Sequence, residues 1–428
     1  MKVTVIAIGS QGDVQPYIAL GTGLKAAGYG VCLATHASFE PAAREHGLEF
    51  SAVEGNPREI LETEAGKALM ETGGNIVTHV RRLKSLANAL IQQVLSSIWK
   101  ACQGTDAIVH SPFGFGSVYA AQKLDVPSIA AYHVPFTRTN AFPSVTVPQL
   151  HLGRVYNKLS HIFFEQLFWQ TFRSSLNEWV VETLKLPCPP FMGDFGAMHK
   201  RGYPIVYGFS PAVIPKPPDW GDRIYITGYW FPDRSTDWQP PAALVDFVQS
   251  GPPPVYVGFG SMNNRSPEEV TEIVIKALDQ CHQRGILLTG WSGLSTSDLP
   301  DHIFSIESIP FDWLFPQMKA LVHHGGAGTT AAGLRAGIPA VIVPFFADQP
   351  FWGDRLFRLG VGSRPIPRKR LAVERLAKAI SIAINDKGMQ SRAAAIGERI
   401  RAEDGTSRAV DIIGHYITAG YKIPARKH

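Results

Sequence analysis

The segment ALVHHGGAGTT at residues 320–330 has the composition of an anion-binding loop. An apolar stretch ends at two histidines, and glycines and threonines follow before a helical pattern begins. Glycine lets a ligand approach the main chain, and the free amides and partial positive charge of a helix N-terminus bind anions. Thr329 and Thr330 add hydroxyl donors. The segment predicts a phosphate or pyrophosphate site, although glycine-rich turns also occur for packing.

Other common phosphate motifs are absent from the sequence. No G-x-x-x-x-G-K-[ST] run occurs, so the chain lacks a P-loop. The first strand-to-helix turn reads GSQG and the second strand ends ATH, which disfavours an NAD site. No D-x-D pair is present to bridge a diphosphate through a metal. We therefore expect the helix end, without a metal, to stabilise the charge of the ligand.

Carboxylates follow two of the apolar stretches. Asp348 and Gln349 lie in PFFADQPFW (344–352), where Asp348 with Pro350 suits a helix N-cap and both polar side chains suit sugar hydroxyls. Asp13 lies in the loop after the first strand, at the edge where open α/β sheets bind ligands. Its carboxylate suits either a helix cap or a base that takes a proton from an acceptor hydroxyl.

These residues must be held by alternating strands and helices. KVTVIAIG, SQGD and VQPYIALGTGLKAAG read as strand, loop and helix, with Pro16 in the first helical turn. Further strands are expected at residues 31–36, 106–111, 127–133, 204–210, 254–260, 285–290, 320–324 and 339–344. This alternation predicts parallel sheets, and 428 residues exceed the size of a single core. We expect an α/β architecture of two similar open sheets with a cleft between them.

A high density of proline separates the two halves. SPAVIPKPPDW, QPPAA and GPPP lie between Ser210 and Val255, and helices and inner strands rarely accept such segments. We assign residues 1–215 to a first domain, 216–252 to a proline-rich linker region and 253–405 to a second domain.

An aromatic, largely helical segment at about 138–200 is inserted in the first domain. Its aromatic residues suit either a small core of their own or an apolar wall that accepts a hydrophobic ligand. His110 and His133 each end a strand beside the expected cleft, where a histidine is either structural or functional.

Composition excludes several classes of protein. A net charge of +5 without long blocks of like charge does not indicate nucleic acid binding. The four cysteines lie far apart without a CxxC pair, which argues against a disulfide framework and a zinc site. The most apolar segment, HIFFEQLFWQTF (161–172), is interrupted by polar residues, and no run reaches the ~18 apolar residues of a membrane span. We expect a cytoplasmic protein, with a peripheral membrane contact left open.

Several long motifs resemble one known family. HHGGAGTTAAGLRAGIPAVIVPFFADQPFWGDRLFRLGVG is similar to the donor-binding signature of the family 1 UDP-sugar glycosyltransferases, and GSQGDVQPYIAL resembles their N-terminal signature. YHVPFTRTNAFP, TGYWFPD, GPPPVYVGFGSM and IESIPFDWLFP resemble the sterol 3β-glucosyltransferase branch. The resemblance runs from Val3 to about Gly405. It implies a GT-B fold, with two Rossmann-like domains whose parallel sheets face an interdomain cleft, and a C-terminal helix (406–428) that returns to the first domain.

The resemblance also implies roles for individual residues. Asp13 matches the catalytic base, and Asp348 and Gln349 match positions that bind the donor sugar. The diphosphate would be held by Ser261, His324, Gly326, Gly328, Thr329 and Thr330. The main chain near Ile309 would contact uracil. The acceptor side would contain Phe113, Phe136 and Arg138, and there we also place His110 and His133.

The sequence departs from members of the family at three positions. Ile306 and Ala332 stand where the plant members have a uracil-stacking tryptophan and a ribose-binding glutamate, and Trp291 is the replacement we consider for the tryptophan. Gln11 stands where relatives commonly read GSRGD, which removes a positive charge near the diphosphate.

The implied reaction is the transfer of glucose from UDP-glucose to a hydroxyl of a lipophilic acceptor, with inversion to a β-glycoside and without a cofactor or a metal. A sterol is the first acceptor considered, and a polyketide or flavonoid aglycone is the second. The alternatives are a nucleotide-sugar epimerase or hydrolase on the same frame, and a silent protein that keeps the fold. We expect a monomer that binds no nucleic acid.

Overall fold

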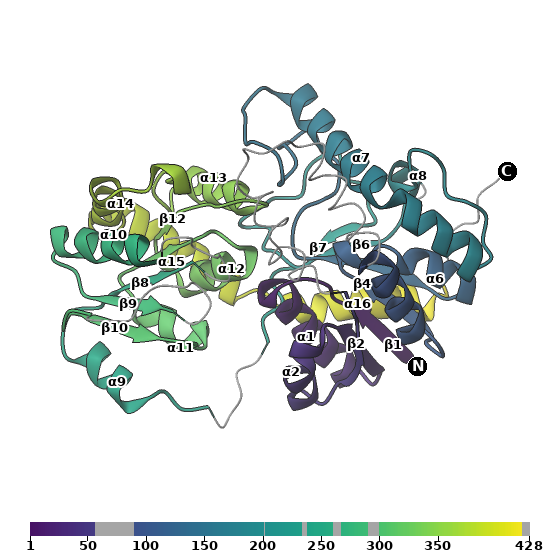
Figure 1. Cartoon of the computed structure of the whole chain (residues 1–428), viewed down its shortest axis with the longest axis horizontal. Coiled ribbons are helices and arrows are strands. Elements are labelled where there is room, and N and C mark those ends of the chain that lie inside the picture. Colours follow the sequence, from purple (N-terminus) through teal and green to yellow (C-terminus); the bar gives the residue numbers. More distant parts are fainter. Residues whose placement is uncertain (56–89, 201, 233–237, 260–266, 290–298, 422–428) are drawn as a thin grey trace.

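The computed structural model describes residues 1–55, 90–200, 202–232, 238–259, 267–289 and 299–421. Two parallel sheets form the centres of two domains that lie side by side (Figure 1). Every strand pairing in the described part of both sheets is parallel. The predicted α/β architecture of two Rossmann-like domains is therefore confirmed.

The N-terminal sheet has seven strands in the order β3-β2-β1-β4-β5-β6-β7. Its strands are β1 (Lys2–Ile6), β2 (Gly30–Thr35), β3 (Glu49–Ala52), β4 (Ala107–His110), β5 (Ser128–Tyr132), β6 (Ile205–Tyr207) and β7 (Ile224–Ile226). Its labelled helices are α1 (Gln11–Ala26), α2 (Glu40–Glu45), α6 (Ser117–Leu124), α7 (Arg154–Glu178) and α8 (Phe195–Lys200), and a π-helical turn (Trp179–Thr183) extends α7. Strand order reverses between β1 and β4, which is the place where such sheets bind ligands.

The C-terminal sheet has five strands in the order β10-β9-β8-β11-β12. Its strands are β8 (Val255–Gly258), β9 (Gly285–Leu288), β10 (Ile303–Ile306), β11 (Ala320–His323) and β12 (Ala340–Ile342). The helices that follow β7 are α9 (Ala242–Gln249), α10 (Pro267–Gln280), α11 (Phe311–Leu314), α12 (Ala327–Ala336), α13 (Gln349–Leu359), α14 (Val373–Asn385), α15 (Lys387–Arg401) and α16 (Gly405–Thr418).

The first strand shows why its sequence is apolar throughout. Val3 and Val5 face a core shared with α1 and α16, whereas Ile6 and Ile8 face the opposite core cluster. Successive side chains of a strand point to opposite faces, and both faces of a parallel sheet are covered by helices. An uninterrupted apolar run is therefore the expected pattern. α16 lies against α1 and β6, so the last described helix packs on the N-terminal domain (Figure 1).

The predicted linker region is only partly a connection. Residues 216–252 contain β7, which is the edge strand of the N-terminal sheet, and α9. An edge strand pairs on one side only, so nearby prolines do not break a ladder of hydrogen bonds. Proline density therefore marked the boundary of the sheet's last strand as well as the connection.

Candidate active site

The N-terminus of α12 presents main-chain amides without a side-chain cap. Gly326 is the N-cap and supplies no capping side chain. The first intrahelical bond runs from the amide of Thr330 to the carbonyl of Gly326, at 2.9 Å. The amides of residues 327–329 precede it and have no intrahelical acceptor. The geometry expected of an anion site is thus present at this helix end.

Glycine is needed at two positions of this loop for different structural reasons. Gly325 has a φ of +90°, and a Cβ there would lie 2.7 Å from the Cγ2 atom of Ile342. Gly328 lies against the other domain, since its Cβ would stand 3.3 Å from the Cα of Gly12. Gly12 belongs to the first turn of α1. The N-termini of α1 and α12, each with a partial positive charge, therefore meet at the domain junction.

Asp13 lies in the first turn of α1, because this helix begins at Gln11, and its expected place in a loop is corrected accordingly. Its Oδ2 atom accepts hydrogen bonds from the amide (2.7 Å) and the hydroxyl (2.8 Å) of Ser10, which completes a capping box. Pro16 lies inside the helix rather than in its first turn. The capping interpretation of Asp13 is correct, but it uses only one carboxylate oxygen.

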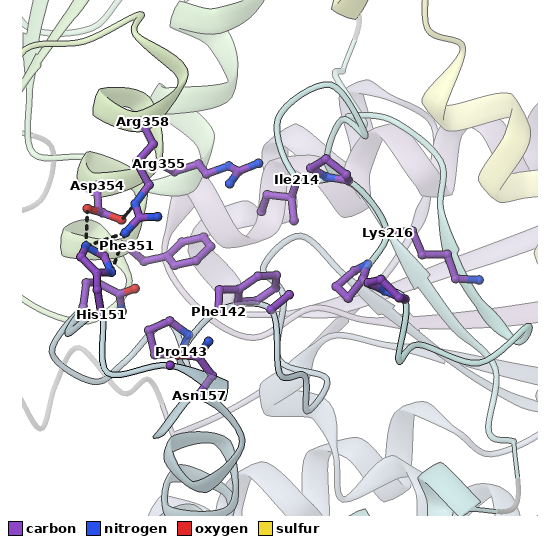
Figure 2. A pocket seen from close by; sticks show the side chains of 16 residues that line it. Phe142, Pro143, His151, Asn157, Ile214, Lys216, Phe351, Asp354, Arg355 and Arg358 are labelled. Carbon is purple, nitrogen blue, oxygen red and sulfur yellow. Dashed lines mark hydrogen bonds and ion pairs between the residues drawn. The ribbon is translucent and has the colours of Figure 1, made fainter. Parts of the chain in front are cut away.

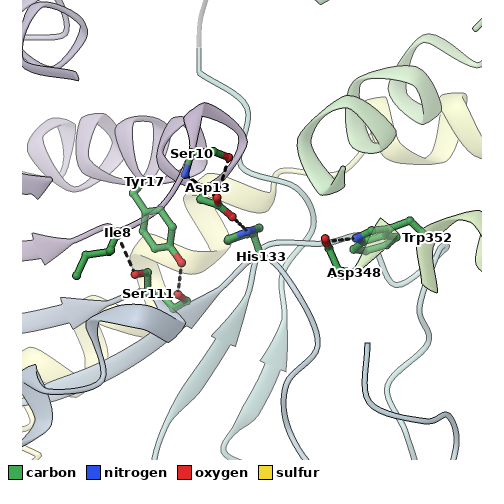
Figure 3. A network of polar contacts seen from close by, with 9 residues as sticks. Ile8, Ser10, Asp13, Tyr17, Ser111, His133, Asp348 and Trp352 are labelled. Atoms are coloured by element: carbon green, nitrogen blue, oxygen red, sulfur yellow. Dashed lines mark hydrogen bonds and ion pairs between the residues drawn. The ribbon is translucent and has the colours of Figure 1, made fainter. Parts of the chain in front are cut away.

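The second oxygen of Asp13 faces His133. Oδ1 lies 3.0 Å from Nε2 of this imidazole, which follows β5 (Figure 3). Burial acts most strongly and would raise the pKa of Asp13, but the hydrogen bond and charge of His133, together with the Ser10 donors, lower it below its usual value. Asp13 is therefore ionised at neutral pH.

His133 is buried and firmly placed. Its ring lies edge-on to Tyr17, with centroids 6.1 Å apart, and Tyr17 donates its hydroxyl to the carbonyl of Ala131. Within the described part of the chain, the Nδ1 atom of His133 has no hydrogen-bond partner. The imidazole thus contacts Asp13 through one nitrogen while the other remains unsatisfied.

Asp348 faces this pair from the C-terminal domain (Figure 3). It occupies the N-cap position of α13, yet its side chain forms no cap and instead accepts a hydrogen bond from Nε1 of Trp352 at 2.8 Å. Burial, followed by the negative charge of Asp13, raises the pKa of Asp348 to about 6, and Trp352 and His133 offset part of this shift. The carboxylate of Asp13 therefore influences the ionisation of a carboxylate from the other domain. Ala347, just before Asp348, has a φ of +56°, a strained value of the kind found at functional sites.

Gln349 is buried, and its side-chain oxygen accepts hydrogen bonds from the loop that precedes α13. Oε1 accepts hydrogen bonds from the amides of Phe345 (2.8 Å) and Phe346 (3.3 Å). This residue therefore shapes the loop that carries Asp348, a role that the sequence did not predict.

The two histidines at the C-terminal end of β11, His323 and His324, are neutral. Burial lowers the pKa of His323 to about 3 and that of His324 to about 4. Nδ1 of His323 accepts a hydrogen bond from the amide of Gly325 at 3.1 Å, which fixes the turn. The hydroxyl of Thr330 is buried and has no partner among the residues described. His324 can offer a hydrogen bond to a ligand but no positive charge.

The aromatic residues predicted on the acceptor side come together. Phe136 stacks on Phe164 with centroids 5.8 Å apart, and Phe113 lies 6.3 Å from Phe168. Phe164 and Phe168 belong to one face of α7. The insertion thus supplies one side of an aromatic cluster whose other side comes from the strand ends.

Two residues predicted on the acceptor side form contacts within the fold. His110 is fully buried, and its ring nitrogens contact the hydroxyl of Tyr203 and the carbonyl of Ser111, each at 3.0 Å. It therefore has no free atom for a ligand. Arg138 forms an ion pair with Glu165 of α7, with its Nε donating at 2.7 Å. This ion pair holds α7 against the segment that follows β5.

A cavity of about 480 Å³ lies at the domain junction beside α13 (Figure 2). It is lined by Phe142 and His151 of the insertion and by Phe351, Arg355 and Arg358 of α13, among others, and by none of the predicted site residues. Phe142 and Phe351 have centroids 5.6 Å apart, and the side chain of Arg358 contacts His151. These contacts join the insertion to α13, the helix that begins directly after Asp348.

Three residues were predicted to contact the nucleotide, and the structure describes one of them. Ser261 and Trp291 lie outside the described residues. Ile309 follows β10 and packs, half-buried, against the core. Among the residues described, no three His, Cys, Asp or Glu side chains gather in a way that could hold a metal ion.

The sequence analysis missed three residues of this site. Ser10 was detectable, because S-x-x-D before a helix is the pattern of a capping box. Trp352 was also detectable, since it lies four residues after Asp348 on an expected helix and so shares its face. The contact of Gly12 with Gly328 joins two domains and has no local signal.

The fold and this junction define a two-domain GT-B protein, and comparison with known proteins identifies the family. The glycosyltransferase family 28 N-terminal domain matches residues 3–143, and the C-terminal domain of erythromycin biosynthesis protein CIII-like proteins matches residues 277–412. The sterol 3-beta-glucosyltransferase of Emericella nidulans is 40% identical over 96% of this chain and 30% of its own length. That of Pichia angusta is 39% identical over 96% of this chain and 33% of its own length.

The chain has the fold and the two family-model matches of a GT-B glycosyltransferase, and it is similar to part of the sterol 3-beta-glucosyltransferases, so the resemblance seen in the sequence motifs is confirmed. It spans about a third of the length of these curated relatives. The fold also matches the glycosyltransferase of kitacinnamycin (TM-score 0.68, 18% identity, 97% of this chain and 98% of that one). The calicheamicin glycosyltransferase CalG4 gives a TM-score of 0.65 at 17% identity, over 98% of both chains. None of the described helices is both long and apolar enough to cross a membrane.

Proposed function

We propose that this chain transfers glucose from UDP-glucose to the hydroxyl of a sterol and forms a β-glucoside. The single observation that carries the proposal is the junction at which Asp13 and His133 face Asp348, beside the meeting N-termini of α1 and α12. This junction combines a proton acceptor, a sugar-binding carboxylate and an anion site within one small region.

The diphosphate is assigned to the N-terminus of α12. Its uncapped amides and the adjacent end of α1 supply donors and positive charge, as a diphosphate leaving group requires. A GT-B neighbour, SsfS6 from Streptomyces sp. SF2575, was solved with thymidine diphosphate (TM-score 0.61, 18% identity, 97% of this chain and 99% of that one), which supports a nucleoside diphosphate as ligand. The helix ends take the role that a metal ion plays elsewhere, so we assign no metal to the reaction.

Asp13 is assigned the role of general base. Its lowered pKa keeps the carboxylate ionised, and Oδ1 is the oxygen that the capping box leaves free. The acceptor hydroxyl gives its proton to this oxygen and attacks the anomeric carbon from the side opposite UDP. The bond between the anomeric carbon and the diphosphate oxygen breaks, the electron pair leaves with UDP, and the configuration at the anomeric carbon inverts.

Asp348 is assigned to the donor sugar, and the acceptor is assigned to the aromatic cluster. Asp348 is held by Trp352 and so presents its remaining carboxylate oxygen to sugar hydroxyls. The cluster of Phe136, Phe164 and Phe168 offers an apolar surface for a flat lipophilic molecule. The names of the curated relatives favour a sterol over a natural-product aglycone.

Product analysis by mass spectrometry tests the proposal. The protein is incubated in EDTA with UDP-glucose, with and without cholesterol. A hexose adduct on cholesterol supports transfer to a sterol without a metal. Loss of UDP-glucose without any acceptor contradicts transfer and indicates a hydrolase or epimerase instead. An adduct on a flavonoid but not on cholesterol contradicts the sterol assignment alone.

A further inference from the structure

An exposed apolar stripe follows one face of α7. Val155, Leu159, Phe163 and Leu167 recur every fourth residue, so they lie on one side of the helix over about 18 Å. Leu152 continues the stripe just before the helix. The exposed fraction of these five side chains ranges from 56% to 73%. Scattered exposed apolar residues are ordinary, but a contiguous stripe of them marks an interaction site.

The loop at Phe191 and Met192 widens this stripe. Both side chains are exposed, at 66% and 56%. The carbonyl of Phe191 accepts hydrogen bonds from Trp169 (2.8 Å) and Gln170 (2.9 Å), and that of Met192 accepts one from Gln166 (2.9 Å). The loop is therefore fastened to α7, and its two apolar side chains belong to the same fixed surface. We call the stripe together with this loop the α7 surface.

The charges around the α7 surface have one sign. Arg154 and Lys158 are exposed beside the stripe, and Arg173 lies over the ring of Phe191, 4.4 Å from its centroid. Glu165 is the acidic residue between Arg154 and Arg173, and it is buried in its ion pair with Arg138. Two copies of this surface would bring cations together, whereas an anionic surface would complement them.

We propose that the α7 surface docks on an anionic lipid bilayer. The helix lies parallel to the membrane plane, with its apolar side chains among the acyl chains and Arg154, Lys158 and Arg173 at the level of the headgroups. An exposed helix with an apolar face and a cationic border is the arrangement that binds such an interface.

Docking in this orientation also brings the acceptor cluster close to the bilayer. Phe163 and Leu167 point outward, while Phe164 and Phe168 of the same helix belong to the aromatic cluster. A lipophilic acceptor that resides in the bilayer would then enter beside α7. This consequence rests on the proposed function, whereas the docking itself does not.

Vesicle co-sedimentation, without donor or acceptor, tests the docking. The full chain is mixed with vesicles of phosphatidylcholine, with or without phosphatidylserine. We expect binding that requires phosphatidylserine and weakens with salt. The double variant Phe163→Glu/Leu167→Glu should lose binding by about tenfold or more, because two apolar side chains that would enter the bilayer become anions. Ile382→Glu on α14, which replaces another exposed apolar residue (40% exposed) outside the α7 surface, is the control and should bind as the wild type does.

Three results would overturn the proposal. In the first, the wild type stays in the supernatant with all vesicles. In the second, the double variant binds as well as the wild type. In the third, the wild type forms a dimer, and Phe163→Glu/Leu167→Glu abolishes this dimer. UDP affinity, measured on the same proteins, should be unchanged in every variant, so a failed docking test remains distinct from a failed donor site. If cholesterol in detergent is glucosylated but vesicle binding is absent, the docking proposal fails and the proposed function stands.

Discussion

Gly12 and Gly328 bring the first turns of two helices from different domains into contact, since a Cβ on Gly328 would lie 3.3 Å from the Cα of Gly12. A Cβ added to Gly12 would have more room, because it would lie 4.0 Å from the amide nitrogen of Gly328. The two positions therefore differ in what they tolerate, although they face each other. This asymmetry gives a matched test of the anion site.

Gly328→Ala should weaken UDP binding by about 1–2 kcal/mol, because the methyl group must displace α1 and narrows the space in front of the amides. Isothermal titration with UDP measures the change. Gly12→Ala is the control, since its methyl group makes only an ordinary contact, and it should leave the affinity within about twofold. Equal affinities for both variants would argue against a diphosphate at this junction.

His133→Asn should move the pH dependence of transfer. Without the imidazole, burial still raises the pKa of Asp13 but the main opposing effect is lost, so the pKa rises. The base must be ionised, and the acidic limb of the rate profile should therefore shift to higher pH.

His36→Asn is the control for this variant, because His36 is another buried histidine of the same domain and contacts the carbonyl of Val53 at 3.1 Å. It should change the stability of the protein without shifting the acidic limb of the pH–rate profile. An unshifted pH–rate profile in His133→Asn would show that His133 does not lower the pKa of Asp13.

Asp348→Asn should stabilise the fold near neutral pH. Folding raises the pKa of Asp348 from 3.8 to about 6, so the folded state binds this proton more tightly than the unfolded chain does. The resulting stability is fully present below about pH 4 and is lost as the pH rises through about 6. The variant lacks this loss, so its free energy of unfolding at pH 7 should exceed that of the wild type by about 1–3 kcal/mol. Urea unfolding at pH 4 and pH 7 measures the difference, which should shrink at pH 4, and transfer should fall in the same variant.

Arg138→Ala should destabilise the protein by about 3 kcal/mol, because it leaves the carboxylate of Glu165 buried without its partner. The double variant Arg138→Ala/Glu165→Ala should recover part of this loss. Thermal or urea unfolding of both proteins checks the expectation. If Arg138→Ala keeps full stability but loses acceptor binding, the arginine belongs to the acceptor site after all.

The frame of this protein was predictable because its strands are buried on both faces. Runs such as KVTVIAIG and PAVIVP stay apolar for that reason, and the glycine loop that follows ALVHH predicts a helix N-terminus. The uncapped N-terminus of α12, where we propose that the anion binds, and the cap at Asp13 follow from local rules of this kind.

Contacts between distant segments were beyond the reach of those rules. Asp13 and His133 are 120 positions apart, and only the strand order β1-β4-β5 brings them together. The same limit explains why two contacts were not predicted: that of Arg138 with Glu165, 27 positions away on α7, and that of His110 with Tyr203, which follows α8. The sequence shows that a polar residue lies at the end of a strand, but it does not show which residue that side chain contacts.

The central claim is that Asp13 is the base at a junction where α12 holds the diphosphate, and Asp13→Asn tests it most directly. UDP affinity is measured by titration, and formation of sterol glucoside is measured by mass spectrometry on the same preparation. The account predicts an unchanged UDP affinity and a transfer rate lower by about a hundredfold or more. Transfer at the wild-type rate by Asp13→Asn would contradict it.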